Sequence, residues 1–339
     1  MQESTFTLMG NEGTRVHVYC WLPDPDEHIQ GVVQIAHGMG ETAARYAEFA
    51  GYLTKHGFAV YANDHRGHGR TVESTEALGD AGVDAFRWMA KDMVNLGELV
   101  AKEHPDVPLF LMGHSMGSFL VQHLMYAGHE RYHAFVLSGT NGKRGLLRFG
   151  EKLALLQCGI QGDNHRSLLL NAIVFGGFNR AFRPATTPFD WLSRDRQEVQ
   201  RFIDDPMCGA ICTAGFFRDF FKLLLEIHLP QHMERIPKHK PVLLFSGELD
   251  PVGLRGKGVL NLYSQYQKLG LQDVEYHLYP GGRHEMLHET NRNEVAHDVL
   301  SWLKRHMPTI EQQHTQNSSQ QDADTVPSFE IQSNQTALM

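Results

Sequence analysis

The sequence predicts an α/β fold in which a mostly parallel sheet is flanked by helices and carries a helical insertion. Short apolar runs of strand length alternate with amphipathic helical patterns over residues 31–138 and again over 242–306. This alternation is typical of βαβ units and of a parallel sheet. Between the two regions, residues 141–236 show helical patterns and no clear buried strand. The insertion therefore falls between two strands of one sheet.

The stretch from Pro108 to Gly117 predicts a strand, a sharp turn and a helix in immediate succession. An apolar run, Leu109 to Met112, ends in Gly113-His-Ser-Met-Gly117, which fits G-x-S-x-G, and an apolar pattern of helical spacing follows. A serine hydroxyl becomes a useful nucleophile only when it is exposed beside a base. A strained turn of this kind lifts it from the backbone, and the flanking glycines allow strand and helix to approach. Ser115 is therefore the candidate nucleophile.

The remaining elements follow in order along the chain. Two strands of a hairpin are predicted around the glycines at 10 and 13, and helices are predicted wherever apolar residues recur at a spacing of three or four. The predicted strands are 6–9, 16–22, 31–36, 58–62, 109–112, 134–138, 242–246 and 274–279; the predicted helices are 46–53, 85–103, 119–125, 146–156, 167–175, 198–203, 216–229, 260–269 and 291–306.

These elements predict three regions. Residues 1–140 and 237–310 form the α/β core, and residues 141–236 form a helical cap. Residues 311–339 are rich in Gln, Asn, Ser, Thr and Asp, so they cannot bury enough apolar surface to order themselves and are expected to form a disordered tail.

Composition excludes several classes of protein. The 339 residues are 42% hydrophobic and 21% charged, with a net charge of −8, which does not favour nucleic-acid binding. No segment has the unbroken apolar length of a membrane-spanning helix, and the N-terminus does not have the pattern of a signal peptide. The four cysteines form no C-x-x-C pair. A cytoplasmic setting, with contact at a membrane surface through the cap, is therefore expected.

A serine nucleophile needs a base and a group that orients it, and both are available downstream. Asp250 follows the strand at 242–246 directly, at the carboxyl end of the sheet where sites gather. His284 lies in a glycine-rich loop after the last strand, which lets its imidazole reach the turn. The order Ser, acid, His is one of the known orders for such a triad. Glu248 is the rival acid, and His68 and His114 are the rival bases.

An oxyanion hole needs two backbone N–H donors aimed at the reacting oxygen. The residue after the nucleophile, Met116, supplies one. The second is expected from His37-Gly-Met-Gly40, after the strand at 31–36, and Met39 is the candidate.

The segment His284-Glu-Met-Leu-His288 is a literal H-E-x-x-H, the motif of zinc peptidases. That motif requires a helix that places both imidazoles on one face. Gly281 and Gly282 stand just before it, so His284 is at best at a helix start. A chance match is the better interpretation, and no metal or other cofactor is expected.

Several of these motifs together resemble the monoacylglycerol lipase and lysophospholipase group of the α/β-hydrolases. The resemblance covers about residues 10–306 and is weakest in the insertion. It rests on Ile35-Ala-His-Gly-Met-Gly-Glu41, Arg45-Tyr46, Asp64-His-Arg-Gly-His-Gly69, Gly113-His-Ser-Met-Gly117, Gly247-Glu-Leu-Asp-Pro251 and Gly282-Arg-His284. Thr71 departs from the usual Ser after the Asp64 motif, and the polar tail lies outside the pattern.

The resemblance implies an eight-stranded core, a helical cap over the site and hydrolysis of single-chain lipid esters through an acyl-enzyme. By position, Ser115 matches the nucleophile, Asp250 the acid and His284 the base. Met39 and Met116 match the oxyanion donors. The expected partner is a small lipid ester, and no oligomeric state is predicted.

Two other functions stay open. A peptidase of the prolyl-aminopeptidase kind would need acidic groups in the cap to hold a substrate amine. The cap contains such residues: Glu198, Asp204, Asp205, Asp219 and Glu226. A catalytically silent binding protein is disfavoured because every catalytic position is filled, although a fold by itself does not define a function.

The segment 215–228 carries the prediction about the substrate. Its polar residues recur at helical spacing and leave an apolar arc too wide for one buried face. Either both flanks pack into the interior, or part of the arc lines an acyl tunnel above Ser115. On the second interpretation, Phe216, Phe217 and Phe220 contact the substrate.

Overall fold

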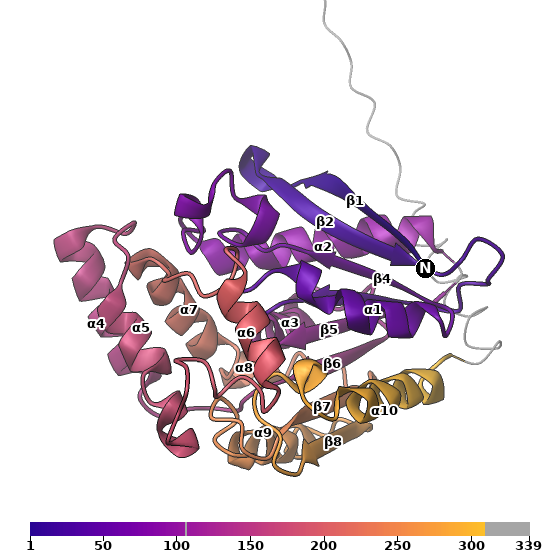
Figure 1. The fold of residues 1–339 in the computed structure, drawn as a ribbon. Helices are drawn as coiled ribbons and strands as arrows, with labels where there is room; N and C mark the ends of the chain where they lie inside the picture. The colour runs from indigo at the N-terminus through magenta and orange to yellow at the C-terminus, as the bar shows by residue number, and fades with distance from the viewer. Residues whose placement is uncertain (106, 309–339) are drawn as a thin grey trace, which may run out of the picture. The chain divides into compact units, whose positions relative to one another are not determined.

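A computed structural model describes residues 1–308 except residue 106, and Met1–His306 form one compact unit. Its centre is an eight-stranded sheet with the order β1-β2-β4-β3-β5-β6-β7-β8 (Figure 1). β1 pairs antiparallel with β2, and β2 pairs antiparallel with β4, while the other neighbours are parallel. The predicted mostly parallel sheet is confirmed. The predicted tail at 311–339 lies outside the described residues.

The strands form where the sequence offers short apolar runs. The inner strands are buried along their whole length, which explains their near-continuous apolar sequence. The bounds are β1 Gln2–Met9, β2 Arg15–Leu22, β3 Gly31–Ala36, β4 Phe58–Asn63, β5 Leu109–His114, β6 Ala134–Ser138, β7 Val242–Gly247 and β8 Val274–Tyr279.

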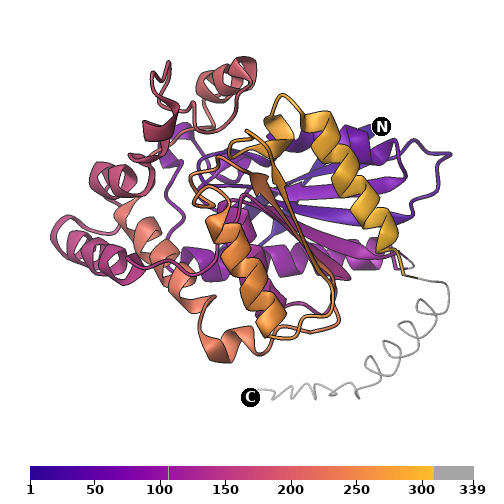
Figure 2. The same cartoon turned by 90° about the horizontal axis from the view of Figure 1, so that it is seen from below.

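Helices cover both faces of the sheet. α1 and α10 pack together on one face, and α2, α3 and α9 lie on the other (Figure 2). Each buries its apolar stripe against the strands, as the periodicity of α2 predicts. The bounds are α1 Ala47–Thr54, α2 Ala85–Glu103, α3 Met116–Ala127, α9 Lys257–Lys268 and α10 Arg292–Arg305. No helix in the described part of the chain is long and apolar enough to cross a membrane.

Residues 141–236 connect β6 to β7 entirely through helices and loops. Both views show them gathered at one end of the sheet (Figures 1 and 2). The elements are α4 Leu147–Gln161, α5 Leu168–Phe175, a 3₁₀ turn Phe178–Phe182, α6 Arg196–Asp204, α7 Ala214–Glu226 and α8 Pro230–Met233. The helical character predicted for this segment is confirmed, while its division from the core as a separate cap remains a prediction.

Candidate active site

The turn between β5 and α3 holds Ser115 in a strained conformation, with φ 51° and ψ −118°. A non-glycine residue adopts such angles only where the surroundings enforce them, often at functional sites. The backbone N–H of Ser115 donates to the Ser138 carbonyl at 2.9 Å. The Ser118 hydroxyl donates to the Ser115 carbonyl at 2.6 Å. The turn is therefore fixed from β6 and from the first turn of α3.

The two glycines of the motif are required by close backbone packing. A Cβ on Gly113 would lie 2.4 Å from the Gly117 carbonyl oxygen, and one on Gly117 would lie 2.1 Å from the Ala36 carbonyl oxygen. Both distances are shorter than any real contact of a Cβ, so β5, α3 and β3 can meet here only without side chains.

Asp250 and His284 form a buried pair at the carboxyl ends of β7 and β8. His284 Nδ1 lies 3.0 Å from Asp250 Oδ1, and both side chains are almost fully buried. Asp250 also accepts hydrogen bonds from the Ser246 hydroxyl at 2.7 Å and from the Val252 N–H at 2.8 Å. The carboxylate is thus fixed by three hydrogen bonds and orients the imidazole through Nδ1, and His284 lines a cavity at Ser115.

In this pair each group stabilises the charged form of the other, which opposes the effect of burial on both pKa values. Burial raises the pKa of Asp250, but His284 and the hydrogen bonds from Ser246 and Val252 outweigh it, and the net pKa is lowered. Burial lowers the pKa of His284, but the charge and hydrogen bond of Asp250 outweigh it, and the net pKa is raised. A raised pKa makes the imidazole a stronger acceptor of a proton.

Ser115 and His284 line the same pocket, and within the described residues no hydrogen bond joins their side chains. Such bonds are often long in ligand-free sites and tighten around substrate. A Cβ on Gly139 would come within 2.8 Å of His284 Cε1, so that glycine makes room for the ring. Trp191, from the helical segment, covers the imidazole with a centroid distance of 5.0 Å. Nothing in the sequence marked Trp191.

The rival residues have other environments. His114 lies beside His284, and its burial, together with His284, lowers its pKa to about 4. His68 is buried with Nδ1 2.9 Å from the Arg66 carbonyl, and it lines neither pocket at Ser115. Glu248 is exposed and accepts from the Gly281 N–H at 3.3 Å. The carboxylate–imidazole hydrogen bond at the site therefore joins Asp250 to His284 and involves none of these rivals.

The backbone N–H groups of Met39 and Met116 have no hydrogen-bond partner among the described residues, and both residues line the cavity at Ser115. Next to Met39, the Gly38 N–H donates to Glu41 Oε1 at 2.6 Å. This bond fixes the loop between β3 and α1 and leaves the following N–H for a ligand.

A buried ion network supports this loop. Arg45 Nη1 lies 2.7 Å from Glu41 Oε2, and its guanidinium holds Glu285 through two bonds of 2.7 Å. Burial raises the pKa of Glu285, but Arg45 outweighs it, and the net pKa is lowered. His288 Nε2 lies 3.1 Å from the Arg45 carbonyl. The polar residues of the H-E-x-x-H segment therefore contact protein groups: His284 contacts Asp250, and Glu285 and His288 contact Arg45. The segment contains a 3₁₀ turn at Met286–His288 and not the helix that the zinc motif requires.

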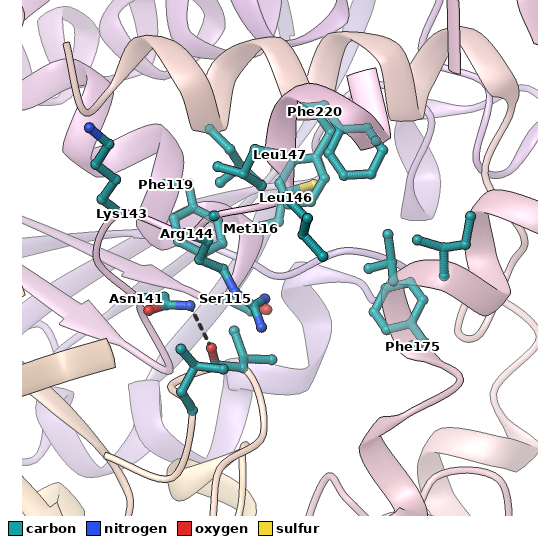
Figure 3. A pocket seen from close by; sticks show the side chains of 18 of the residues that line it. Ser115, Met116, Phe119, Asn141, Lys143, Arg144, Leu146, Leu147, Phe175 and Phe220 are labelled. Atoms are coloured by element: carbon teal, nitrogen blue, oxygen red, sulfur yellow. Dashed lines mark hydrogen bonds between the residues drawn. The ribbon is translucent and has the colours of Figure 1, made fainter. Parts of the chain in front are cut away.

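Two cavities meet at Ser115. The larger, about 650 Å³, is lined mainly by apolar side chains from α3, α4, α5 and α7 (Figure 3). The smaller, about 350 Å³, contains His284, Trp191 and Glu285. Ser115, Met39 and Phe175 line both. A molecule with a long apolar part and a small polar part would fit across the junction.

Only one of the three predicted phenylalanines reaches a cavity. Phe220 lines the larger one. Phe216 and Phe217 are fully buried, and the Phe216 ring packs 5.1 Å from Phe86. The structure therefore corrects the prediction that Phe216 and Phe217 contact the substrate. They pack in the interior, because α7 packs against α2 and α3 as well as α4. Periodicity cannot separate a face packed on protein from one that faces a cavity.

The sheet order, the strained serine turn and the Asp250–His284 pair at the sheet's carboxyl edge define an α/β-hydrolase fold. The sequence matches the family model described as serine aminopeptidase, S33, over residues 27–291. It is 31% identical over 313 residues to a monoacylglycerol lipase of Mycolicibacterium smegmatis, covering 90% of this chain and 98% of that one. The chain therefore belongs to this α/β-hydrolase family, within its monoacylglycerol lipase group.

Other comparisons agree. The mouse monoglyceride lipase is 26% identical over 300 residues, with 85% of this chain and 86% of that one covered. A carboxyl esterase from Bacillus coagulans, solved with glycerol, superposes with a TM-score of 0.83 at 26% identity, covering 90% of this chain and 98% of that one. The monoglyceride lipase of Saccharomyces cerevisiae, at 20% identity and a TM-score of 0.71, shares the fold.

Proposed function

We propose that this chain is a serine hydrolase that cleaves carboxylic esters of single-chain lipids, such as monoacylglycerols or lysophospholipids. The observation that carries the proposal is the cavity of about 650 Å³, largely apolar, that opens on Ser115 beside the buried Asp250–His284 pair. The names of the relatives, monoacylglycerol lipase and carboxyl esterase, support the same class of substrate.

The proposed mechanism uses the residues already described. The Ser115 hydroxyl attacks the ester carbonyl while His284 takes its proton, and Asp250 stabilises the resulting imidazolium. The N–H groups of Met39 and Met116 bind the oxyanion. His284 then returns the proton to the leaving alcohol, which leaves an acyl group on Ser115. Water, deprotonated by His284, hydrolyses this acyl-enzyme and restores the free serine.

Replacement of the nucleophile tests this mechanism. Ser115→Ala should reduce kcat by about 10⁴-fold or more while the melting temperature is retained. A fluorophosphonate probe should label the wild type at Ser115. Labelling that persists in Ser115→Ala would assign the nucleophile to another residue.

Chain-length dependence tests the substrate class. Each buried methylene contributes roughly 0.8 kcal/mol, so kcat/KM should rise by about fourfold per methylene from acetate to an optimum. Shortening Phe220, which lines the cavity, to Leu should move the optimum toward longer chains, whereas Phe217→Leu, at a residue outside the cavity, should not. A flat profile, with cleavage of aminoacyl amides instead, would favour the aminopeptidase.

The aminopeptidase alternative finds little support in the site. None of the acidic residues proposed for amine binding lines either cavity: Glu198, Asp204, Asp205, Asp219 and Glu226. Glu41 and Glu285 line the smaller cavity, but Arg45 holds both carboxylates. An amine would have to displace this guanidinium.

We also propose transient contact of the helical segment with a lipid surface. Large apolar side chains are exposed on and around α4 and α5: Leu146, Phe149, Leu155, Leu156, Ile160, Leu168, Leu169 and Ile173. Exposed apolar groups at this density mark interaction sites, and several border the mouth of the larger cavity.

Co-sedimentation with phosphatidylcholine vesicles tests this contact, and the bound fraction should fall in the double variant Leu156→Glu/Ile160→Glu. Leu260→Glu, an exposed leucine on α9, is the matched control; equal losses would contradict the proposal.

A further inference from the structure

The charged side chains that line the larger cavity at Ser115 are all cationic. Besides its apolar lining it contains Lys143 and Arg144, and no Asp or Glu lines it. His228 also lines it, but burial, together with Lys143, lowers the pKa of this imidazole to about 4, so it adds no charge at neutral pH. Arg144 extends into the cavity from the connection between β6 and α4 (Figure 3). The cavity is therefore apolar with a cationic side, and this is more than a neutral lipid ester requires.

Arg144 has no partner of its own. Among the described residues, no carboxylate lies within 4 Å of its guanidinium and no hydrogen bond joins it to another group. Burial lowers the pKa of Arg144, and the more distant Asp250 opposes this. Asp250 is not an ion-pair partner of Arg144, because its oxygens lie beyond 4 Å of the guanidinium and accept from His284, Ser246 and Val252 instead.

Arg144 is partly buried, and the hydration that its guanidinium loses in this largely apolar pocket is not replaced by a protein anion, which is unfavourable. Two other arginines differ from Arg144 in having a carboxylate partner: Arg45 and Arg66 are both buried, and each forms an ion pair. The backbone before Arg144 is also fixed, since Asn141 Nδ2 donates to the Val252 carbonyl at 2.9 Å and the Gly142 N–H donates to the Gly258 carbonyl at 3.1 Å. The cation is thus held at the cavity without a protein anion.

We propose that Arg144 is a specificity-determining residue that binds a negatively charged group of the ester substrate. This inference rests on the proposed ester hydrolysis and narrows it to single-chain esters that carry a phosphate or carboxylate. The guanidinium presents paired N–H donors in a planar fork that matches both anions. Lys143, exposed at the same cavity, adds a second positive charge.

Matched substrates test the proposal and separate the two anions. 1-Decanoylglycerol 3-phosphate is compared with 1-decanoylglycerol, and monomethyl dodecanedioate with methyl dodecanoate, all as monomers in solution. The wild type should prefer the anionic member of at least one pair by tenfold or more in kcat/KM. Arg144→Gln should reduce that ratio by about tenfold to a hundredfold, and Arg144→Lys should retain part of it. Arg148→Gln, an exposed arginine on α4 outside the cavity lining, is the matched control.

A wild-type preference for neither anionic ester, or an unchanged ratio in Arg144→Gln, would overturn the proposal while leaving ester hydrolysis intact. If the wild type cleaves none of the four esters, the proposed function fails instead. Binding of decyl phosphate, measured by calorimetry, then still tests Arg144: a tenfold weaker Kd in Arg144→Gln than in wild type supports the anion site, and equal Kd values overturn it. Melting temperatures confirm that each variant is folded.

Discussion

The guanidinium of Arg45 holds the carboxylate of Glu285 through two hydrogen bonds of 2.7 Å, across 240 positions of sequence. The same guanidinium holds Glu41, whose other oxygen receives the Gly38 N–H beside Met39. Glu285 follows His284 directly. One buried cation therefore connects the loop of the proposed oxyanion donors to the loop of the proposed base.

Replacement of that cation should destabilise the protein strongly. Arg45→Met leaves the carboxylates of Glu41 and Glu285 buried without the arginine that neutralises them, and breaking a buried pair in this way costs about 3–5 kcal/mol. Chemical denaturation at pH 7 measures this loss. The control is Arg305→Met, which removes an exposed pair with Glu275 and should cost at most about 1 kcal/mol. Equal losses would mean that burial of the Arg45 network adds nothing to stability.

The loss in Arg45→Met should depend on pH. Burial raises the pKa values of Glu41 and Glu285, but the positive charge of Arg45 outweighs it, so both pKa values lie below the ordinary value of 4.5. A carboxyl with a lowered folded-state pKa contributes stability above its unfolded pKa and loses it as the pH falls through the folded one. The difference between wild type and Arg45→Met should therefore narrow below about pH 4.5. A constant difference down to the acid transition would contradict this.

The pH dependence of activity should report the Asp250–His284 pair. The proposed mechanism needs neutral His284, and its pKa is raised above 6.5, so the acid limb of kcat/KM should lie above that pH. Asp250→Asn removes the main group that raises this pKa. The limb should move to lower pH, and kcat should fall by about 10⁴-fold. If the acid limb of kcat/KM stays at the same pH in Asp250→Asn, the group that titrates in this limb is not His284.

Gly139→Ala should impair catalysis more than stability. A Cβ there would lie 2.8 Å from His284 Cε1, and the residue has φ +56°. The backbone strain should cost about 1–2 kcal/mol, while displacement of the imidazole should lower kcat by roughly 10²-fold. Gly82→Ala is the control, because Gly82 has φ +73° with nothing within 4 Å. Similar kcat values in the two variants would show that Gly139 does not position His284.

The two histidines of the H-E-x-x-H match should differ in importance. His284 pairs with Asp250, whereas His288 contacts a backbone carbonyl of Arg45. His284→Ala should abolish turnover, His288→Ala should lower it by less than about tenfold, and chelation with phenanthroline should leave the rate unchanged. Comparable losses in both variants, restored by added zinc, would instead identify a metal site.

Local chemistry was readable from the sequence because it depends on short patterns. β3, β6, β8 and α2 have the predicted bounds, since apolar runs and helical periodicity respond directly to burial. The G-x-S-x-G pattern between a strand and a helix predicts the strained turn at Ser115. The structure shows why glycine is required at positions 113 and 117, since a Cβ at either would overlap backbone atoms. The strand ends also predicted Asp250 and His284, because parallel strands bring their carboxyl ends to one edge.

Only the tertiary structure decided which side chains meet. Glu285 belonged to a metal motif in the sequence and binds Arg45 in the fold, and Phe217 shared an arc with Phe220 but packs in the interior. Arg144 resembles any surface arginine until its cavity and missing partner are seen. These outcomes depend on contacts between residues far apart in the chain. A local pattern records that a side chain is buried or charged, but the partner is chosen by the packing of separate elements.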